Sequence, residues 1–204
     1  EELKALFEEE ALKNNVYPLD GDVGPRFAKM QSLAAPQDDE LVYYPPAAIR
    51  VHESVSPPVK NKSHELIAEV DIPENGDDGM LVTAGGRTAG YGFFIKGGHL
   101  MYVYNYIGIN RTVIISDEKV PIGKSELRMK FTKTGNFEGD AEIFINGKSV
   151  GKEHIDKTVP ATFSIEETFD VGEDTGSPII EDVYAVPFRC ESLQKLTVKI
   201  DKTK

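Results

Sequence analysis

The chain has 204 residues, and 40% of them are hydrophobic, which is enough for a sizeable core and excludes a globally disordered chain. Acidic residues (34) outnumber basic residues (23), and the formal net charge is -11. Such a charge repels phosphate backbones and anionic lipid headgroups, so we expect neither nucleic acid nor a membrane as a partner. The single cysteine, Cys190, excludes an intramolecular disulfide and a cysteine-rich metal site.

The first fifteen residues, EELKALFEEEALKNN, have the apolar spacing of an amphipathic helix. Leu3, Leu6 and Phe7 fall on one face, and glutamates occupy the other. We therefore predict a helix over 1–15 whose apolar stripe needs a surface to cover. Because the chain begins with Glu1 inside this pattern rather than with methionine, we interpret it as a piece of a longer protein.

Residues 16–63 contain seven of the twelve prolines. Proline removes a backbone donor and restricts the residue before it, so we predict irregular structure in this segment. The segment also carries apolar residues that a free linker would not need, among them Phe27, Leu33 and Tyr43. We therefore predict that 16–63 wraps over a folded body.

From residue 64 onward the hydrophobic pattern changes to a period of two, which is typical of strands with one buried and one solvated face. Asn146-Gly147 and Gly97-Gly98 indicate two tight hairpins. Strands recur without helical segments between them, so we predict a mainly β domain over 64–204, folded as an antiparallel sandwich. The clearest strand segments are LIAEVDI (66–72), ELRMKF (126–131), AEIFIN (141–146) and LTVKID (196–201).

Five carboxylates and two glycines crowd the stretch DVGEDTGSPIIEDV, residues 170–183. Asp170, Glu173 and Asp174 offer the oxygen ligands that Ca²⁺ requires, but their spacing does not match the helix-loop-helix calcium pattern. The other interpretation is a solvated turn in which Asp174 or Thr175 caps its own backbone. The sequence favours the turn and leaves the calcium site as the alternative.

Tyrosines alternate along the stretch GYGFFIKGGHLMYVYNYIG, and Tyr102, Tyr104 and Tyr106 share one face of a predicted strand. A tyrosine ring can stack on a sugar while its hydroxyl forms a hydrogen bond, so this face is a candidate glycan-binding surface. The simpler interpretation is that these are half-buried strand residues, because aromatic residues are enriched in strands.

The sequence contains no recognisable catalytic constellation. Four histidines form no zinc spacing and are predicted to be surface or turn residues: His52, His64, His99 and His154. There is neither a G-x-S-x-G elbow nor a phosphate-binding glycine loop. We interpret Cys190 as a lone, half-buried cysteine without a nucleophilic role. No catalytic residue is assigned to this chain.

Four stretches, LKALFEEEALKNNVYPLD, YYPPAAIRV, GYGFFIKGGHLMYVYNYIG and FDVGEDTGSPI, resemble the C-terminal part of long bacterial arylsulfatases. In that family an α/β domain hydrolyses sulfate esters with a formylglycine, made from a C/S-x-P-x-R motif, beside a calcium ion. The resemblance implies that this chain is the tail of such a protein, a concanavalin-A-like jelly-roll sandwich. It also implies that 1–15 belongs to the end of the catalytic-domain region and that the parent is periplasmic or secreted.

The reactive residues of that family are absent from this sequence. Cys190 begins C-E-S-L-Q, and Ser56–Lys60 reads SPPVK, with lysine where the motif requires arginine. The resemblance therefore implies a non-catalytic accessory domain, inactive alone, that buttresses the catalytic sulfatase domain of the same polypeptide or its substrate cleft. No cofactor is expected apart from the calcium considered above. The alternative function is a lectin-like carbohydrate-binding module for a sulfated or plain glycan, with calcium as a potential aid.

Overall fold

The computed structural model describes residues 1–17, 19, 21, 24, 25, 29 and 38–201 of the chain. It divides into two compact units, Glu1–Ala34 and Ala35–Lys204, and each is considered by itself. The predicted wrapping residues Phe27 and Leu33 lie outside the described residues.

The first unit contains the helix α1 (Glu2–Lys13), which confirms the helix predicted over 1–15. Ala11 is the buried residue of α1. The ring of Phe7 meets Tyr17 edge-on with their centroids 6.4 Å apart, so the segment after the helix covers part of the apolar stripe. Within the described residues, no helix combines the length and the apolar character that crossing a bilayer demands.

The second unit consists of β-strands and a short 3₁₀ helix, η1. Its elements are, in chain order, β1 (Glu40–Tyr43), β2 (Val51–His52), η1 (Glu53–Val55), β3 (His64–Ile72), β4 (Gly79–Gly85), β5 (Gly90–Lys96), β6 (His99–Tyr106), β7 (Asn110–Lys119), β8 (Gly123–Gly135), β9 (Glu138–Ile145), β10 (Lys148–Ile155), β11 (Thr168–Val171), β12 (Glu173–Asp174), β13 (Phe188–Arg189) and β14 (Leu193–Ile200).

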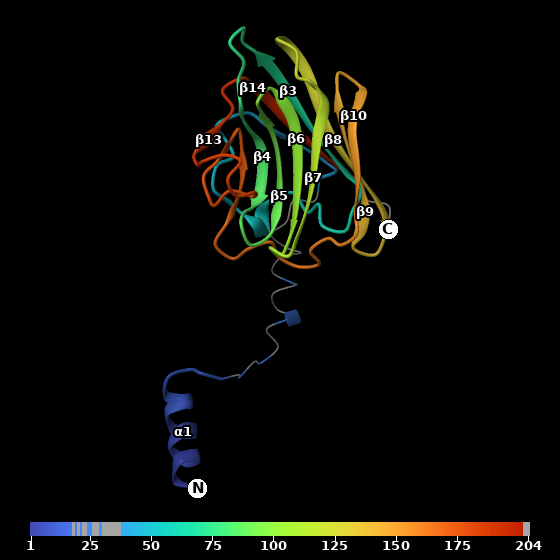
Figure 1. Cartoon of the computed structure of the whole chain (residues 1–204). Helices are drawn as coiled ribbons and strands as arrows, with labels where there is room; N and C mark the ends of the chain where they lie inside the picture. Colours follow the sequence, from blue (N-terminus) through green and yellow to red (C-terminus); the bar gives the residue numbers. More distant parts are fainter. Residues whose placement is uncertain (18, 20, 22–23, 26–28, 30–37, 202–204) are drawn as a thin grey trace. The chain divides into compact units, whose positions relative to one another are not determined.

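These strands form two sheets packed face to face, and this arrangement confirms the predicted sandwich. A six-stranded sheet has the order β1-β14-β3-β8-β9-β10. An eight-stranded sheet has the order β12-β13-β4-β5-β6-β7, with β11 paired to β4 and β2 paired to β11. Figure 1 shows β4 to β7 side by side in one layer and β3, β8 and β14 in the other.

The six-stranded sheet follows the sequence pattern closely. In β3, Leu66 and Ala68 are buried while Glu69 is exposed, as a strand with one solvated face requires. The hairpin between β9 and β10 turns at Asn146-Gly147 with φ angles of 49° and 80°. The hairpin between β5 and β6 turns at Gly97-Gly98 with φ angles of 60° and 78°. Positive φ at both central residues is the geometry of the tight turns that both dipeptides predict.

Strands β4, β5 and β6 of the eight-stranded sheet are covered on both faces. Phe93 and Tyr102 face the six-stranded sheet and belong to the main core. On the other face, Phe94 packs in a second buried cluster with Ile179. Ile179 belongs to the segment between β12 and β13, residues 175–187, which we call the cover loop. The second cluster therefore positions the cover loop on the outer face of this sheet.

Within the described part of 16–63, two short strands depart from the predicted irregular structure. β1 pairs with β14 from Glu40 opposite Lys199 to Tyr43 opposite Leu196, and β2 pairs with β11. β1 is an edge strand, so it needs a partner on one side only and ends before the prolines that follow it. A second difference is that β13 joins β4 in parallel, so the pairing is not entirely antiparallel.

Gly90 tests the backbone geometry at the start of β5. Its φ is +142°, and a Cβ there would collide with the carbonyl oxygen of Ala84. We expect Gly90→Ala to lower the free energy of unfolding by about 3 kcal/mol or more, because the new Cβ collides with the backbone of Ala84 and a positive φ strains an alanine. Gly97→Ala is the control: its φ is +60° and a Cβ would meet no atom within 4 Å. That change should cost about 1 kcal/mol. Equal losses in urea denaturation would contradict this geometry.

Candidate functional site

An open groove with a volume of about 740 Å³ borders the cover loop. Arg87, from the β4–β5 hairpin, and Lys96, at the end of β5, line it together with the cover loop. The loop lies directly on β5, since a Cβ on Gly92 would approach Ile179 Cγ2 to 2.8 Å. We call this hollow the cover-loop groove. Its lining residues from the loop are Pro178, Glu181, Asp182, Val183, Tyr184 and Ala185.

Tyr184 fixes the wall of the groove. Its hydroxyl donates to Asp174 Oδ2 at 2.7 Å and accepts from the backbone nitrogen of Ile179 at 3.0 Å. Its ring stacks on Phe188 with a centroid distance of 4.5 Å and meets Phe94 at 5.4 Å. One side chain thus ties the middle of the cover loop to the sheet below it.

Asp174 is the polar anchor of this arrangement and is almost fully buried. Burial raises the pKa of its carboxyl to about 6, against the stabilising hydrogen bonds from Tyr184 and the Gly176 nitrogen. The neighbouring Asp170 and Glu167 push the pKa in the same direction as burial. Burial also raises the pKa of Tyr184, followed by the effect of Asp174, so the tyrosine remains a neutral donor.

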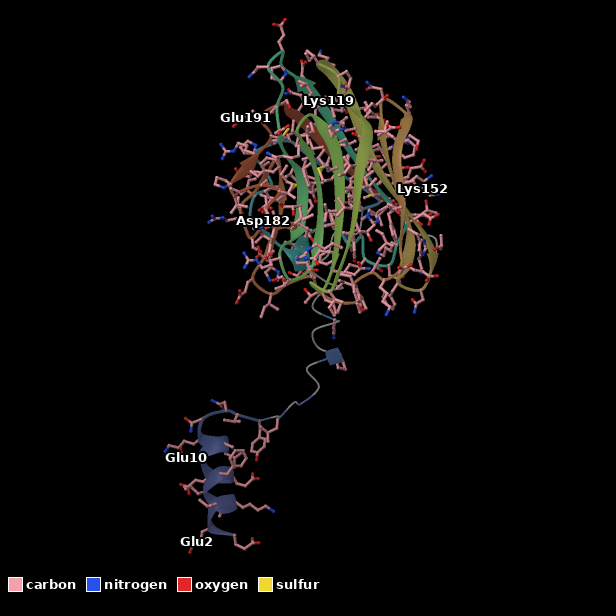
Figure 2. All side chains as sticks on the ribbon, in the orientation of Figure 1. Glu2, Glu10, Lys119, Lys152, Asp182 and Glu191 are labelled. Atoms are coloured by element: carbon pink, nitrogen blue, oxygen red, sulfur yellow. The ribbon has the colours of Figure 1, made fainter. Side chains whose placement is uncertain are left out.

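The groove carries both signs of charge. Arg87 Nε lies 2.9 Å from Glu181 Oε1, and the Arg87 side chain is 62% exposed. Lys96 lies 5.6 Å from the centre of the Phe188 ring. Asp182 projects at the surface of the same loop (Figure 2). An exposed arginine–carboxylate pair is weak and exchanges partners readily, so Arg87 is available to a ligand.

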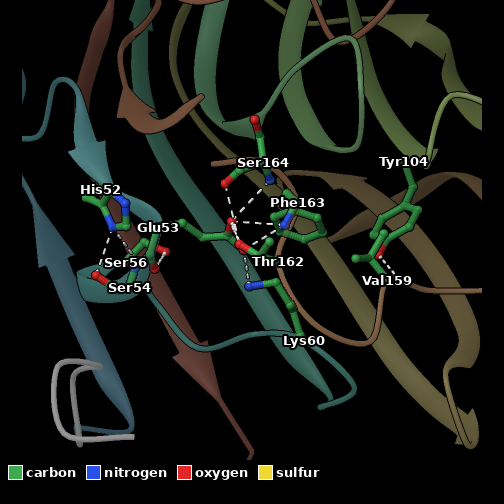
Figure 3. A network of polar contacts seen from close by, with 10 residues as sticks. All are labelled: His52, Glu53, Ser54, Ser56, Lys60, Tyr104, Val159, Thr162, Phe163 and Ser164. Carbon is green, nitrogen blue, oxygen red and sulfur yellow. Dashed lines mark hydrogen bonds and ion pairs between the residues drawn. The ribbon is translucent and has the colours of Figure 1, made fainter. Parts of the chain in front are cut away.

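Glu53 anchors a second loop, the turn at residues 162–164 (Figure 3). The buried carboxylate of Glu53 accepts hydrogen bonds from the Thr162 hydroxyl and from the backbone nitrogens of Phe163 and Ser164, and it pairs with Lys60. Burial alone would raise the pKa of Glu53, but Lys60 and these donors outweigh it and keep the pKa lowered. Glu53 therefore acts as an ionised anchor for the 162–164 turn.

The predicted tyrosine face exists, but it points inward. Tyr102 and Tyr104 are buried in the core between the sheets, and Tyr106 packs partly buried beside them. Their shared face was predicted correctly, yet burial leaves no exposed ring on Tyr102 or Tyr104 on which a sugar could stack. The structure therefore does not bring these residues to the groove.

The acidic residues lie on strands and are buried, so the solvated turn is wrong. The predicted capping is present, because Asp174 Oδ1 accepts from the backbone nitrogen of Gly176 at 3.1 Å. Asp170, Glu173 and Asp174 are 1%, 8% and 1% exposed. Asp170 accepts from the backbone nitrogen and hydroxyl of Thr175, and Glu173 accepts from the guanidinium of Arg189. Within the described residues, no group of three or more His, Cys, Asp or Glu side chains is placed to hold a metal ion.

The predicted exposure of three further residues can be compared with the structure. His64 is buried and His99 is half-buried rather than exposed, because both lie at strand ends where their Nδ1 atoms bond to carbonyl oxygens. Cys190 is buried, and burial raises the pKa of its thiol to about 12. Such a thiol stays protonated and is a poor nucleophile.

Comparison with known proteins identifies the fold. No family model and no curated protein matches the chain. The CBM40 module of the Ruminococcus gnavus IT-sialidase bound to α2,3-sialyllactose matches with a TM-score of 0.52 and 14% identity, over 72% of this chain and 79% of that one. The same module bound to α2,6-sialyllactose gives 0.51 and 14%, over 80% and 94%. A leech intramolecular trans-sialidase gives 0.53 and 9%, over 82% of this chain and 26% of that one.

At these identities the likeness shows the fold alone, and it confirms the predicted jelly-roll sandwich. It also corrects the resemblance to arylsulfatases, which is wrong: the similar structures are sialidase modules, and no family model or curated sequence supports a sulfatase. The accessory role beside a catalytic sulfatase domain falls with it. The stretch GYGFFIKGGHLMYVYNYIG, one of the four that carried the resemblance, forms the β5–β6 hairpin of the core.

The residues of the cover-loop groove could not be recognised from the sequence. Arg87 sits in a glycine-flanked hairpin and Lys96 precedes a predicted turn, so each resembles an ordinary surface cation. Glu181 and Asp182 were counted only as part of an acidic stretch. The signal that unites them is the cover loop folding back over β5, and a contact so distant in the chain leaves no periodic pattern.

Asp174 predicts a specific dependence of stability on pH. Its folded pKa of about 6 lies above its ordinary value of 3.8, so the folded state binds the proton more tightly. Its contribution to stability is therefore present below about pH 4 and is lost as the pH rises through about 6, by at most about 3 kcal/mol. Asp174→Asn keeps an acceptor for Tyr184 and removes this titration. Between pH 4 and 7 the free energy of unfolding of the variant, measured by denaturant titration, should rise relative to that of the parent protein. If the free energies of unfolding of the two proteins change with pH in parallel, the pKa shift of Asp174 is absent.

Proposed function

We propose that this chain is a carbohydrate-binding module and that the cover-loop groove binds its glycan. The observation that carries the proposal is an open, charged groove on a sandwich whose fold matches sialidase modules bound to sialyllactose. This is the lectin-like alternative of the sequence analysis, now assigned to different residues. The chain carries the ligand and no reaction is attributed to it.

The chemistry of the groove suits a sugar. Glycans present many hydroxyls, each able to donate and accept, and Arg87, Glu181 and Asp182 supply donors and acceptors in the groove lining. An acidic sugar adds a carboxylate or sulfate that can pair with the Arg87 guanidinium in a bidentate manner. Such a ligand would take the place of Glu181 on Arg87, at little cost because that pair is exposed.

Calorimetry with a small glycan panel tests this proposal. The panel contains α2,3-sialyllactose, a sulfated lactose and lactose, which share a core and differ in charge. We expect saturable binding of at least one member. Arg87→Ala should weaken that binding about tenfold, because losing a charged hydrogen bond costs about 1.5 kcal/mol or more.

Lys148→Ala is the matched control. Lys148 is 64% exposed and paired with Glu118, much as Arg87 is with Glu181, but it lies on the β9–β10 hairpin away from the groove. It should bind like the parent protein. No heat with any glycan at saturating concentration, or equal effects of the two substitutions, would count against the cover-loop groove as the binding site.

Calcium assistance at Asp170, Glu173 and Asp174 is a separate question with its own test. These carboxylates already accept hydrogen bonds from the protein, so an ion would have to replace existing partners. We therefore expect glycan affinity to be the same in EDTA and in millimolar calcium. A loss of binding in EDTA that calcium restores would instead support the calcium site.

A further inference from the structure

A small cavity lies between the two sheets, separate from the cover-loop groove. Its volume is about 10 Å³, which is about the space that one water molecule needs. His64, Tyr91, Tyr102, Tyr104 and Thr158 contribute to its lining. A cavity lined only by hydrocarbon would stay dry, so the polar atoms of these residues decide whether it is filled.

His64 supplies an acceptor without a partner. The residue is 8% exposed, and its Nδ1 lies 2.8 Å from the carbonyl oxygen of Lys62. A carbonyl can only accept, so Nδ1 carries the proton and Nε2 has a bare lone pair. Nε2 is buried and has no hydrogen-bond partner among the described residues. Burial lowers the pKa of His64 to about 4, so the ring is neutral at pH 7 and Nε2 remains an acceptor.

The hydroxyls of Thr158 and Tyr104 supply the complementary groups. Thr158 is 6% exposed, and its Oγ1 has no partner within the described part of the chain. The Tyr104 oxygen accepts from the backbone nitrogen of Val159 at 2.8 Å, which leaves its proton to be donated. The cavity thus brings together an acceptor that needs a proton and hydroxyls that can give one.

We propose that this cavity is a binding site for one ordered water molecule. The water donates to His64 Nε2 and accepts from the Thr158 hydroxyl, so the two atoms of the cavity lining that lack a protein partner are both satisfied. The Tyr104 hydroxyl can donate to the same water. An unpaired polar group in the core is costly, whereas buried water with two or more polar partners is a normal part of a core. The proposal is independent of glycan binding, because the cavity and the cover-loop groove share no lining residue.

The segment after β10 closes this site. Phe163 lines the cavity, and the ammonium of Lys60 lies 4.6 Å from the centre of its ring. Glu53 holds both neighbours, since it pairs with Lys60 and accepts from the Phe163 nitrogen (Figure 3). The water is therefore retained behind an anchored turn and should exchange slowly with bulk solvent.

The sign of one stability change tests the proposal. Thr158→Val keeps the side-chain shape and removes the hydroxyl. With water bound, the variant loses a hydrogen-bond partner of that water, and the melting temperature falls. In a dry cavity the same change removes an unsatisfied hydroxyl, and the melting temperature rises. A rise overturns the proposal. Thr197→Val, at a residue that is also 6% exposed but does not line the cavity, controls for the general cost of this substitution.

NMR on the full chain gives the direct readout. We expect a cross-peak between a long-lived water and the amide of Thr158 or Val159, which Thr158→Val weakens and Thr197→Val leaves unchanged. A high-resolution crystal structure should place that water about 2.7–3.2 Å from His64 Nε2. An ordered but empty cavity, or a side chain bonded to Nε2, would show that no water site exists.

Discussion

The hydrogen bond between the Tyr184 hydroxyl and the Asp174 carboxylate is the contact on which the proposed site depends. It is buried between the cover loop and the sheet, and the same hydroxyl accepts from the Ile179 nitrogen. Phe94 and Phe188 enclose the ring, so the polar contact has one possible geometry in an apolar setting. Burial of the ionised Asp174 carboxyl lowers the stability of the folded protein near neutral pH. The same carboxyl holds the cover loop, which forms a wall of the groove.

The backbone at Arg87 is held by a chain of hydrogen bonds that begins at Glu53. Glu53 fixes the backbone at Ser164, whose hydroxyl accepts from the nitrogen of Glu167. The Glu167 carboxylate accepts from the hydroxyl of Ser177, and that hydroxyl oxygen accepts from the Arg87 nitrogen. Arg87 therefore has an exposed side chain on an anchored backbone. That combination suits a binding residue, because the ligand orders only the side chain.

Much of the fold could be predicted from the sequence, and most of the site could not. β3, β8, β9 and β14 have one buried and one solvated face, so their alternation is visible, and the Asn146-Gly147 and Gly97-Gly98 turns follow from backbone sterics. β4 to β6 are buried on both faces, so their sequence identifies strands without saying which face holds a site. The three tyrosines were grouped on one face correctly, but for this reason the sequence left open whether that face binds a glycan or packs in the core. The cover loop depends on tertiary contacts that no local pattern records.

The most direct test of the account is a two-dimensional NMR titration of the full chain with the glycan that binds best. The account predicts that perturbed amides cluster on the cover loop and the β4–β5 hairpin, around Arg87, Glu181 and Ala185, while the outer face of the six-stranded sheet stays unchanged. Perturbed amides on that outer face or in the β6–β7 turn after Tyr106, with unchanged chemical shifts for the groove amides, would contradict it.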